Sequence, residues 1–108
     1  MTAYLIDLGY QDPLVTRIQF VVNTEYRFVV KYNEREDRYK IVTMHQNNQL
    51  VLVDVVLVAG INLLDQSHSV YLDGRLYLYD KAKPSDPEMG RDATWDSFGD
   101  EVFLLFEV

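Results

Sequence analysis

The sequence predicts an all-β protein, a small antiparallel β-barrel or β-sandwich of about seven or eight short strands. Apolar side chains recur at every second position through most of the chain, as they do on one face of a strand. β-branched and aromatic residues dominate these runs, and the connections between them are short and polar. The length of 108 residues fits one domain, so we expect residues 1–108 to form a single unit.

A three-stranded antiparallel meander is expected over residues 16–44. Runs in which apolar and polar residues alternate lie at 17–22, 26–32 and 39–44. Asn23 suits a tight turn after the first run, because Asn tolerates left-handed backbone geometry. The all-polar segment 33–37 has the length of a common hairpin loop and links the other two runs.

The next strand is expected to change face in its middle. His45–Asn48 forms the turn before it, and Gln49–Ala59 is almost continuously apolar. Asp54 interrupts this run, and a carboxylate that is buried without a partner is costly. A kink or bulge near Asp54, which turns the opposite set of side chains inward, resolves the conflict.

Two turn signals and a final strand complete the predicted fold. Gly60–Asp65 has the pattern of a compact turn with two leucines packed beneath it. Asp73-Gly74 marks the centre of a hairpin over residues 70–79, because Asp-Gly is a strong hairpin signal. The last strand, Glu101–Val108, is apolar on both faces, which is typical of a central or interface strand.

Residues 80–100 are predicted to form an irregular acidic loop. They include two of the three prolines, and proline donates no hydrogen bond to a sheet. A long irregular loop in a compact domain usually carries function or contacts. Thr94–Phe98 fits a single helical turn capped by Thr94, and this short turn is the most helix that the sequence predicts.

The negative charge is concentrated in the last quarter of the chain. The formal net charge is −7, and residues 84–108 hold one basic and seven acidic side chains. Residues 17–40, in contrast, hold six basic and four acidic side chains. An acidic chain lacks the clustered Lys and Arg that bind phosphates, so we expect no direct specific nucleic-acid binding. It has no run of about 18 apolar residues, so we expect no membrane insertion.

Residue types with catalytic or metal-binding chemistry occur without the partners that such sites need. His45 and His68 are predicted in solvated polar turns, and neither has a second ligand at metal-site spacing. The carboxylates of residues 86–96 do not match a calcium loop, and Ser67-His68-Ser69 lacks a nucleophile elbow. The chain has no cysteine, which excludes disulfides and thiolate sites. We therefore expect no enzyme, no cofactor and no metal site.

The aromatic residues leave three interpretations open, because the chain holds eight tyrosines and one tryptophan. Aromatic side chains stabilise sheet faces by pairing across strands. Tyr and Trp are also enriched at protein interfaces. A third possibility is an exposed platform on which sugar rings stack.

A series of short motifs carries a family resemblance. In chain order they are Phe20-Val21-Val22, Tyr32-Asn33-Glu34-Arg35, Tyr39-Lys40-Ile41, Gly60-Ile61-Asn62-Leu63-Leu64, Gly74-Arg75-Leu76, Phe98-Gly99 and Val102-Phe103-Leu104-Leu105-Phe106. With this order and spacing the chain resembles the plug domain family of contractile phage-tail baseplates, described in cyanophage, from about Ile18 to Val108. Tyr39 stands where the family often has Trp, a conservative change for packing.

The resemblance implies a structural part of the virion, made in the host cytoplasm and packed at the junction of tail tube and central hub. Its implied partners are other baseplate, hub or tail-tube subunits, and it is expected to be a homo-oligomer within the assembly. The expected contact residues lie on the hairpin tip, the acidic loop and the last strand. They are Tyr32, Asn33, Arg35, Asp86, Glu88, Asp92, Trp95, Phe98, Phe103 and Leu105.

Two functions from other classes remain open. A stand-alone binding module for carbohydrate or peptide requires a concave face of exposed aromatic residues. A small hydrolase or isomerase requires an acid–base pair that faces one cavity.

If the protein is a baseplate plug, its acidic surface would repel the phosphates of DNA that passes through the tail. The carboxylates of residues 86–100 should then face the lumen or a basic partner.

Overall fold

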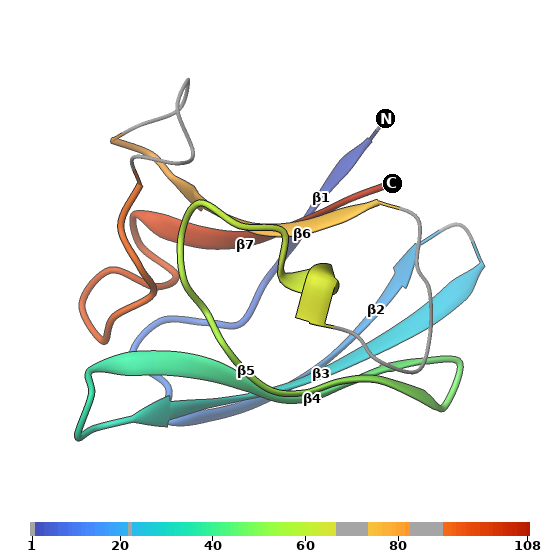
Figure 1. Cartoon of the computed structure of the whole chain (residues 1–108), viewed down its shortest axis with the longest axis horizontal. Helices are drawn as coiled ribbons and strands as arrows, with labels where there is room; N and C mark the ends of the chain where they lie inside the picture. The colour runs from blue at the N-terminus through green and yellow to red at the C-terminus, as the bar shows by residue number, and fades with distance from the viewer. Residues whose placement is uncertain (1, 22, 67–73, 83–89) are drawn as a thin grey trace.

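The computed structural model describes residues 2–21, 23–66, 74–82 and 90–108, and these form seven strands and one 3-10 turn (Figure 1). The strands are β1 (Ala3–Ile6), β2 (Leu14–Val21), β3 (Thr24–Asn33), β4 (Arg38–Gln46), β5 (Gln49–Val56), β6 (Arg75–Asp80) and β7 (Val102–Glu107), and the turn is η1 (Leu63–Gln66). The all-β prediction is confirmed. Within the described ranges no α-helix occurs.

The strands form two antiparallel sheets that face each other (Figure 1). One sheet has the order β2-β3-β4-β5 and the other the order β1-β7-β6. Over the residues described, no strand pairs across the two sheets, so the barrel is not closed. The two-faced strand β7 is central in its sheet, as predicted, and β1 is an additional strand that pairs Ala3 with Glu107.

The predicted meander is confirmed, and β5 extends it by one strand. The turns that join these strands use Asn23 (φ 63°), Asn47 (φ 48°) and Asn48 (φ 68°), because tight hairpin turns need positive φ and Asn tolerates it. The turn after β4 begins later than predicted. His45 therefore lies on β4, half-buried, rather than in a solvated turn, while His68 is outside the described residues.

The predicted change of face at Asp54 is confirmed. Leu52 points inward before it and Val55 points inward after it, while Asp54 itself has φ 54° and is exposed. The neighbouring strand β4 changes face at the same level, where Val42 is an extra residue in its pairing with β3. The Asp54 carboxylate lies 2.8 Å from Lys40 Nζ, so the charge has a partner and stays in solvent.

The core lies between the two sheets and contains side chains from both. Tyr26 of the larger sheet meets Phe106 of the smaller one edge-to-face, with ring centroids 4.8 Å apart. Leu63 and Leu64 of η1 are buried, as predicted for the compact turn. Gly74 lies directly before β6, which is the second arm of the predicted hairpin, and the first arm lies outside the described residues.

A glycine pair tests how tightly the loop after β1 packs on the segment before β7. Gly9 (φ 77°) and Gly99 (φ 90°) both need positive φ, but only at Gly99 would a Cβ overlap a backbone atom, the Gly9 carbonyl oxygen. We expect Gly9→Ala to lower the free energy of unfolding by about 1–2 kcal/mol, the cost of left-handed backbone alone. Gly99→Ala should cost at least about 2 kcal/mol more, measured by urea denaturation, and equal losses would contradict the close contact.

Candidate functional site

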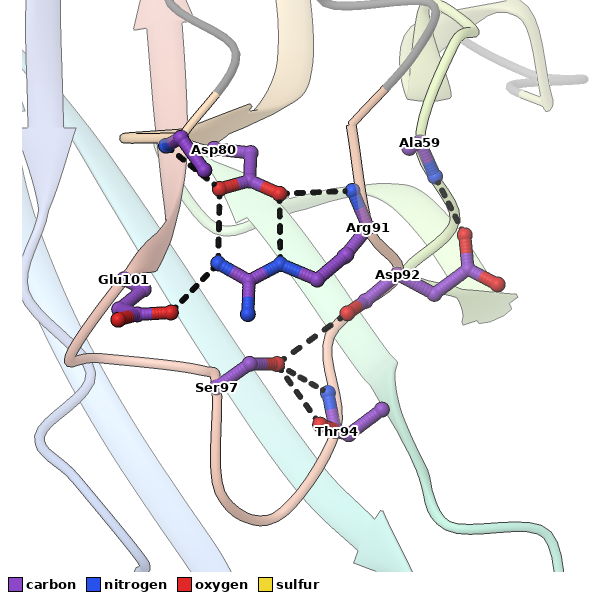
Figure 2. Close-up of polar contacts among 8 residues, drawn as sticks. Ala59, Asp80, Arg91, Asp92, Thr94, Ser97 and Glu101 are labelled. Atoms are coloured by element: carbon purple, nitrogen blue, oxygen red, sulfur yellow. Dashed lines mark hydrogen bonds and ion pairs between the residues drawn. The ribbon is translucent and has the colours of Figure 1, made fainter.

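The part of the acidic loop that the structure describes begins at an ion pair between a buried carboxylate and a half-exposed arginine (Figure 2). Asp80 ends β6, and its side chain is 1% exposed. Arg91 Nε donates to Asp80 Oδ2 at 2.8 Å, and Arg91 Nη2 donates to Oδ1 at 2.9 Å. The backbone N–H groups of Ala82 and Arg91 also donate to this carboxylate, at 2.9 and 3.0 Å. The bidentate geometry satisfies the buried charge and fixes where the loop returns to β6.

The charges of this pair are mutually stabilised. The hydrogen bonds from Arg91 hold the pKa of Asp80 well below its usual range, although burial opposes this shift. The same bonds, with one to Glu101 at 2.6 Å, raise the pKa of Arg91 above its ordinary value. Neither group changes charge near neutral pH, so the pair is a structural clamp.

Past the clamp, the segment bridges the two sheets. Asp92 Oδ2 lies 3.2 Å from Arg38 Nε on β4, and its Oδ1 accepts the Ala59 N–H at 2.9 Å. Ala93 is fully buried, and its carbonyl accepts the Tyr39 N–H at 3.1 Å. The segment that starts at β6 in one sheet is therefore bonded to β4 of the other.

The predicted helical turn at residues 94–98 is confirmed, and its capping differs in detail. The Phe98 N–H donates to the Thr94 carbonyl at 3.0 Å, which closes a single turn. Ser97 Oγ accepts the Thr94 N–H at 3.0 Å, and the two hydroxyl oxygens lie 2.8 Å apart. Ser97 therefore caps the start of the turn, whereas the Thr94 hydroxyl bonds the Ser97 side chain instead of the backbone (Figure 2).

The hairpin tip and the acidic loop meet at Asp37. Its Oδ1 accepts the Tyr32 hydroxyl at 2.7 Å and the Trp95 N–H at 3.0 Å. The Tyr32 and Trp95 rings pack with centroids 4.8 Å apart. The hydrogen bond to the Asp37 carboxylate is the main cause that raises the pKa of Tyr32 to about 12. Two segments that lie far apart in the sequence therefore form one continuous surface, which we call the joined surface (residues 32–38 and 90–101).

Open hollows lie on this surface. One has a volume of about 580 Å³ and carries both signs of charge; its lining residues are Arg38, Gly90, Arg91, Asp92, Thr94, Asp96, Ser97, Asp100 and Glu101. A second, of about 570 Å³, is lined by Tyr32, Asn33, Glu34, Arg35 and Glu36. In the described part of the chain, no group of three His, Asp or Glu side chains is placed to hold a metal. The arrangement suits polar and ionic contact with another protein.

The structure brings together some of the predicted contact residues and separates others. Tyr32, Asn33, Arg35, Asp92 and Trp95 belong to the joined surface. Phe98 is 3% exposed and packs in the core, so its ring does not form surface. Phe103 and Leu105 lie half-buried on the outward side of β7. Asp86 and Glu88 are outside the described residues.

Sequence reasoning missed the residues that hold this surface in place, namely Asp37, Asp80 and Arg91. One signal was present, because Arg91 is the only basic side chain among the seven acidic ones of residues 84–108. A lone arginine in an acidic segment is a reasonable candidate for a buried pair. No comparable signal marks Asp37, whose partner Trp95 is 58 positions away.

The comparison with known families identifies the class of the protein. The family described as "Cyanophage baseplate Pam3 plug gp18" matches residues 3–108. The chain therefore belongs to this family, which confirms the resemblance found in the sequence. A baseplate plug family is a family of structural virion components, and it implies association with other baseplate components. No curated protein matches the chain. Where the structure describes the chain, no helix is long and apolar enough to cross a bilayer.

The Asp80–Arg91 pair predicts an acid-dependent loss of stability. Asp80→Asn should lower the free energy of unfolding at pH 7 by about 1.5–3 kcal/mol, because it weakens the charge-assisted hydrogen bonds of a buried group, while the half-exposed Arg91 keeps Glu101. The pKa of Asp80 is lowered in the folded state. The difference in free energy of unfolding between wild type and Asp80→Asn is therefore complete above the unfolded carboxyl pKa of about 3.9. This difference in free energy of unfolding should become smaller as the pH falls below that value.

Urea denaturation at several pH values between about 2 and 7 measures this difference. Asp54→Asn is the matched control, since Asn tolerates the positive φ and the pair with Lys40 is exposed. The control should change stability by less than about 1 kcal/mol. A difference in free energy of unfolding between wild type and Asp80→Asn that stayed constant down to the lowest pH would contradict the prediction.

The contact that Asp37 makes between the hairpin tip and the segment 90–101, which we call the joint, is tested through Tyr32 and the single tryptophan. Asp37→Gly removes the carboxylate, and glycine tolerates the local backbone φ of 49°. We expect the pKa of Tyr32 to fall toward its ordinary value, followed by NMR titration of its ring. Trp95 fluorescence should become more accessible to acrylamide quenching. Glu36→Gln, in the same loop, is the control and should change neither quantity; unchanged quenching in Asp37→Gly would refute the joint.

Proposed function

We propose that the protein is the plug subunit that packs at the junction of the tail tube and the central hub of a phage baseplate. The family match over residues 3–108 carries this proposal, because it spans nearly the whole chain. In this role the protein contacts hub or tail-tube subunits and helps to keep the channel shut or continuous until the DNA is ejected. It is made in the host cytoplasm, and its copies form a homo-oligomer within the assembly.

The joined surface supports a permanent structural contact. Asp80–Arg91 fixes one end of the acidic segment, and Asp37 bonds the segment to the hairpin tip. A surface that is already ordered binds a partner without the entropic cost of ordering flexible loops. Guanidinium groups and carboxylates lie side by side around the larger hollow, so the surface can match a partner of mixed charge.

The exposed carboxylates favour a position beside the DNA path. Asp96 and Asp100 are exposed on the joined surface. An acidic wall repels the phosphates of passing DNA and so avoids retaining the genome in the channel. We therefore place Asp96 and Asp100 toward the lumen or toward a basic partner.

The aromatic cluster around Trp95 does not form a platform for sugar rings. A sugar platform requires exposed rings, and in the aromatic cluster Tyr39 is 2% and Phe98 is 3% exposed. The Trp95 ring packs against Tyr32, with its backbone N–H held by Asp37. These rings stabilise the joint between two segments of the chain.

Deleting the gene from the parent phage and supplying variants from a plasmid tests the proposal. Particles without the protein should have defective baseplates and low infectivity, and the wild-type protein should restore both. Asp96→Lys with Asp100→Lys should reduce infectivity more than Glu34→Lys with Glu36→Lys, an equal change of charge on the hairpin tip. Tails of normal length and full infectivity without the protein would refute the proposed function.

A further inference from the structure

We propose that the outer edge of β2 binds an extended segment of another baseplate subunit by strand addition. The inference rests on the proposed function, which makes the protein part of a larger assembly. It names a second contact, apart from the joined surface, and the chemistry of its partner. The partner strand carries apolar side chains on one face and acidic side chains beside them.

The hydrogen-bonding pattern shows which backbone groups of β2 face outward. The Tyr32 N–H of β3 donates to the Pro13 carbonyl at 2.9 Å, so position 13 is bonded toward β3. The β2–β3 register then runs without a shift from Leu14↔Lys31 to Val21↔Thr24. Because the pattern alternates along an antiparallel pair, the odd-numbered residues bond β3. The N–H and C=O groups of the even-numbered residues of β2 point away from β3, to an edge at which no strand of the described residues pairs.

The same even-numbered residues present apolar side chains on the outer face of the sheet. Leu14 is 59% exposed, Ile18 is 49% exposed and Phe20 is 65% exposed. Thr16, between them, is also exposed. Backbone donors and acceptors therefore lie directly beside an apolar stripe, which is the combination that an added strand uses.

The other sheet edges in the described residues are short or blocked, and β2 differs from them. β1 has only four residues. On β6, the Leu76 N–H is taken by Asn62 Oδ1 at 3.0 Å. β5 is interrupted by a register shift and by the positive φ of Asp54. β2 runs for eight residues with no proline and no bulge, and proteins normally protect such an edge from unwanted pairing.

The charges around the edge select an acidic partner. Arg27 and Lys31 of β3 lie across from Ile18 and Leu14, on the face of the apolar stripe. Among the described residues neither forms an ion pair, although Arg27 Nη2 donates to Asn48 Oδ1 at 2.9 Å. β3 also places Glu25 across from Phe20, so two cations and one carboxylate of β3 flank the stripe. A second copy paired through this edge brings the same Arg27 and Lys31 with it, so an acidic strand of a different subunit is the better fit.

Complementation of the gene-deleted phage tests the edge. Thr16→Pro removes a donor that points away from β3, and Ile18→Lys places a charge on the edge, as many natural edge strands do. Each should reduce incorporation into purified baseplates by at least about tenfold, measured by mass spectrometry against the tube protein. Val53→Lys is the matched control, because Val53 is 54% exposed on the same sheet but on β5. It should incorporate like wild type.

Thermal unfolding of each purified variant separates a lost contact from a lost fold, and Ile18→Lys keeps the test decisive if Thr16→Pro does not fold. If folded Ile18→Lys incorporates like wild type, the edge proposal is wrong and the proposed function stands. If the wild-type protein is itself absent from baseplates, the proposed function is wrong. If the wild type is a dimer in solution, and Ile18→Lys is a monomer that incorporates normally, the edge serves a second copy and the proposal is overturned.

Hydrogen exchange gives an independent measurement on the protein alone and in baseplates. In the free protein the amides of Thr16, Ile18 and Phe20 should exchange quickly, while those of Arg17 and Gln19 are protected by β3. In assembled baseplates the even-numbered amides should become protected as well. Fast exchange that persists at these amides after assembly would count against strand addition.

Discussion

The buried carboxylate of Asp80 is the constraint on which the candidate surface depends. It ends β6 with its side chain removed from water, and a charge in that position is tolerated only when its hydrogen bonds are satisfied. Arg91 supplies both side-chain bonds and one backbone bond, so the chain must return to the end of β6 at this residue. The positions of Asp92, Ala93 and the turn at 94–98 follow from that return, because they are the next residues along the chain.

The returning segment also couples the two sheets beyond their shared core. Asp92 and Ala93 bond to β4 and to the residues after β5, while their own segment is anchored on β6. The hairpin tip is connected to this segment through Asp37, because one oxygen of its carboxylate accepts hydrogen bonds from both the Tyr32 hydroxyl and the Trp95 N–H. The joined surface, assembled from two segments of the chain, is thus held by side chains that are bonded within the molecule. Such a surface is suited to a fixed place in a large assembly, since it needs little reorganisation to bind.

The exposed apolar residues of β2 have a different character from the joined surface. The joined surface is ordered by ion pairs and is rich in carboxylates. The β2 edge is apolar and bordered by Arg27 and Lys31, neither of which forms an ion pair in the described structure. Two surfaces of opposite chemistry on one small subunit are a simple means of orienting it between different neighbours.

The sequence by itself determined the strands, because alternation of apolar residues reports local geometry within one strand. It placed the meander, the change of face at Asp54, the leucine turn at 60–65, the two-faced last strand and the single turn at 94–98. It also determined the family, whose motifs are spread over the whole chain. The regions of the candidate site were identified in this way, but not their contact with each other.

Only the tertiary structure decided which distant residues meet. Asp80 and Arg91 are 11 positions apart, and Asp37 and Trp95 are 58 apart, so no local period connects them. The burial of Phe98 and the pairing of β1 with β7 likewise depend on how the two sheets face each other. The free edge of β2 is also a tertiary property, because strand order in a sheet decides which backbone groups remain without a neighbour.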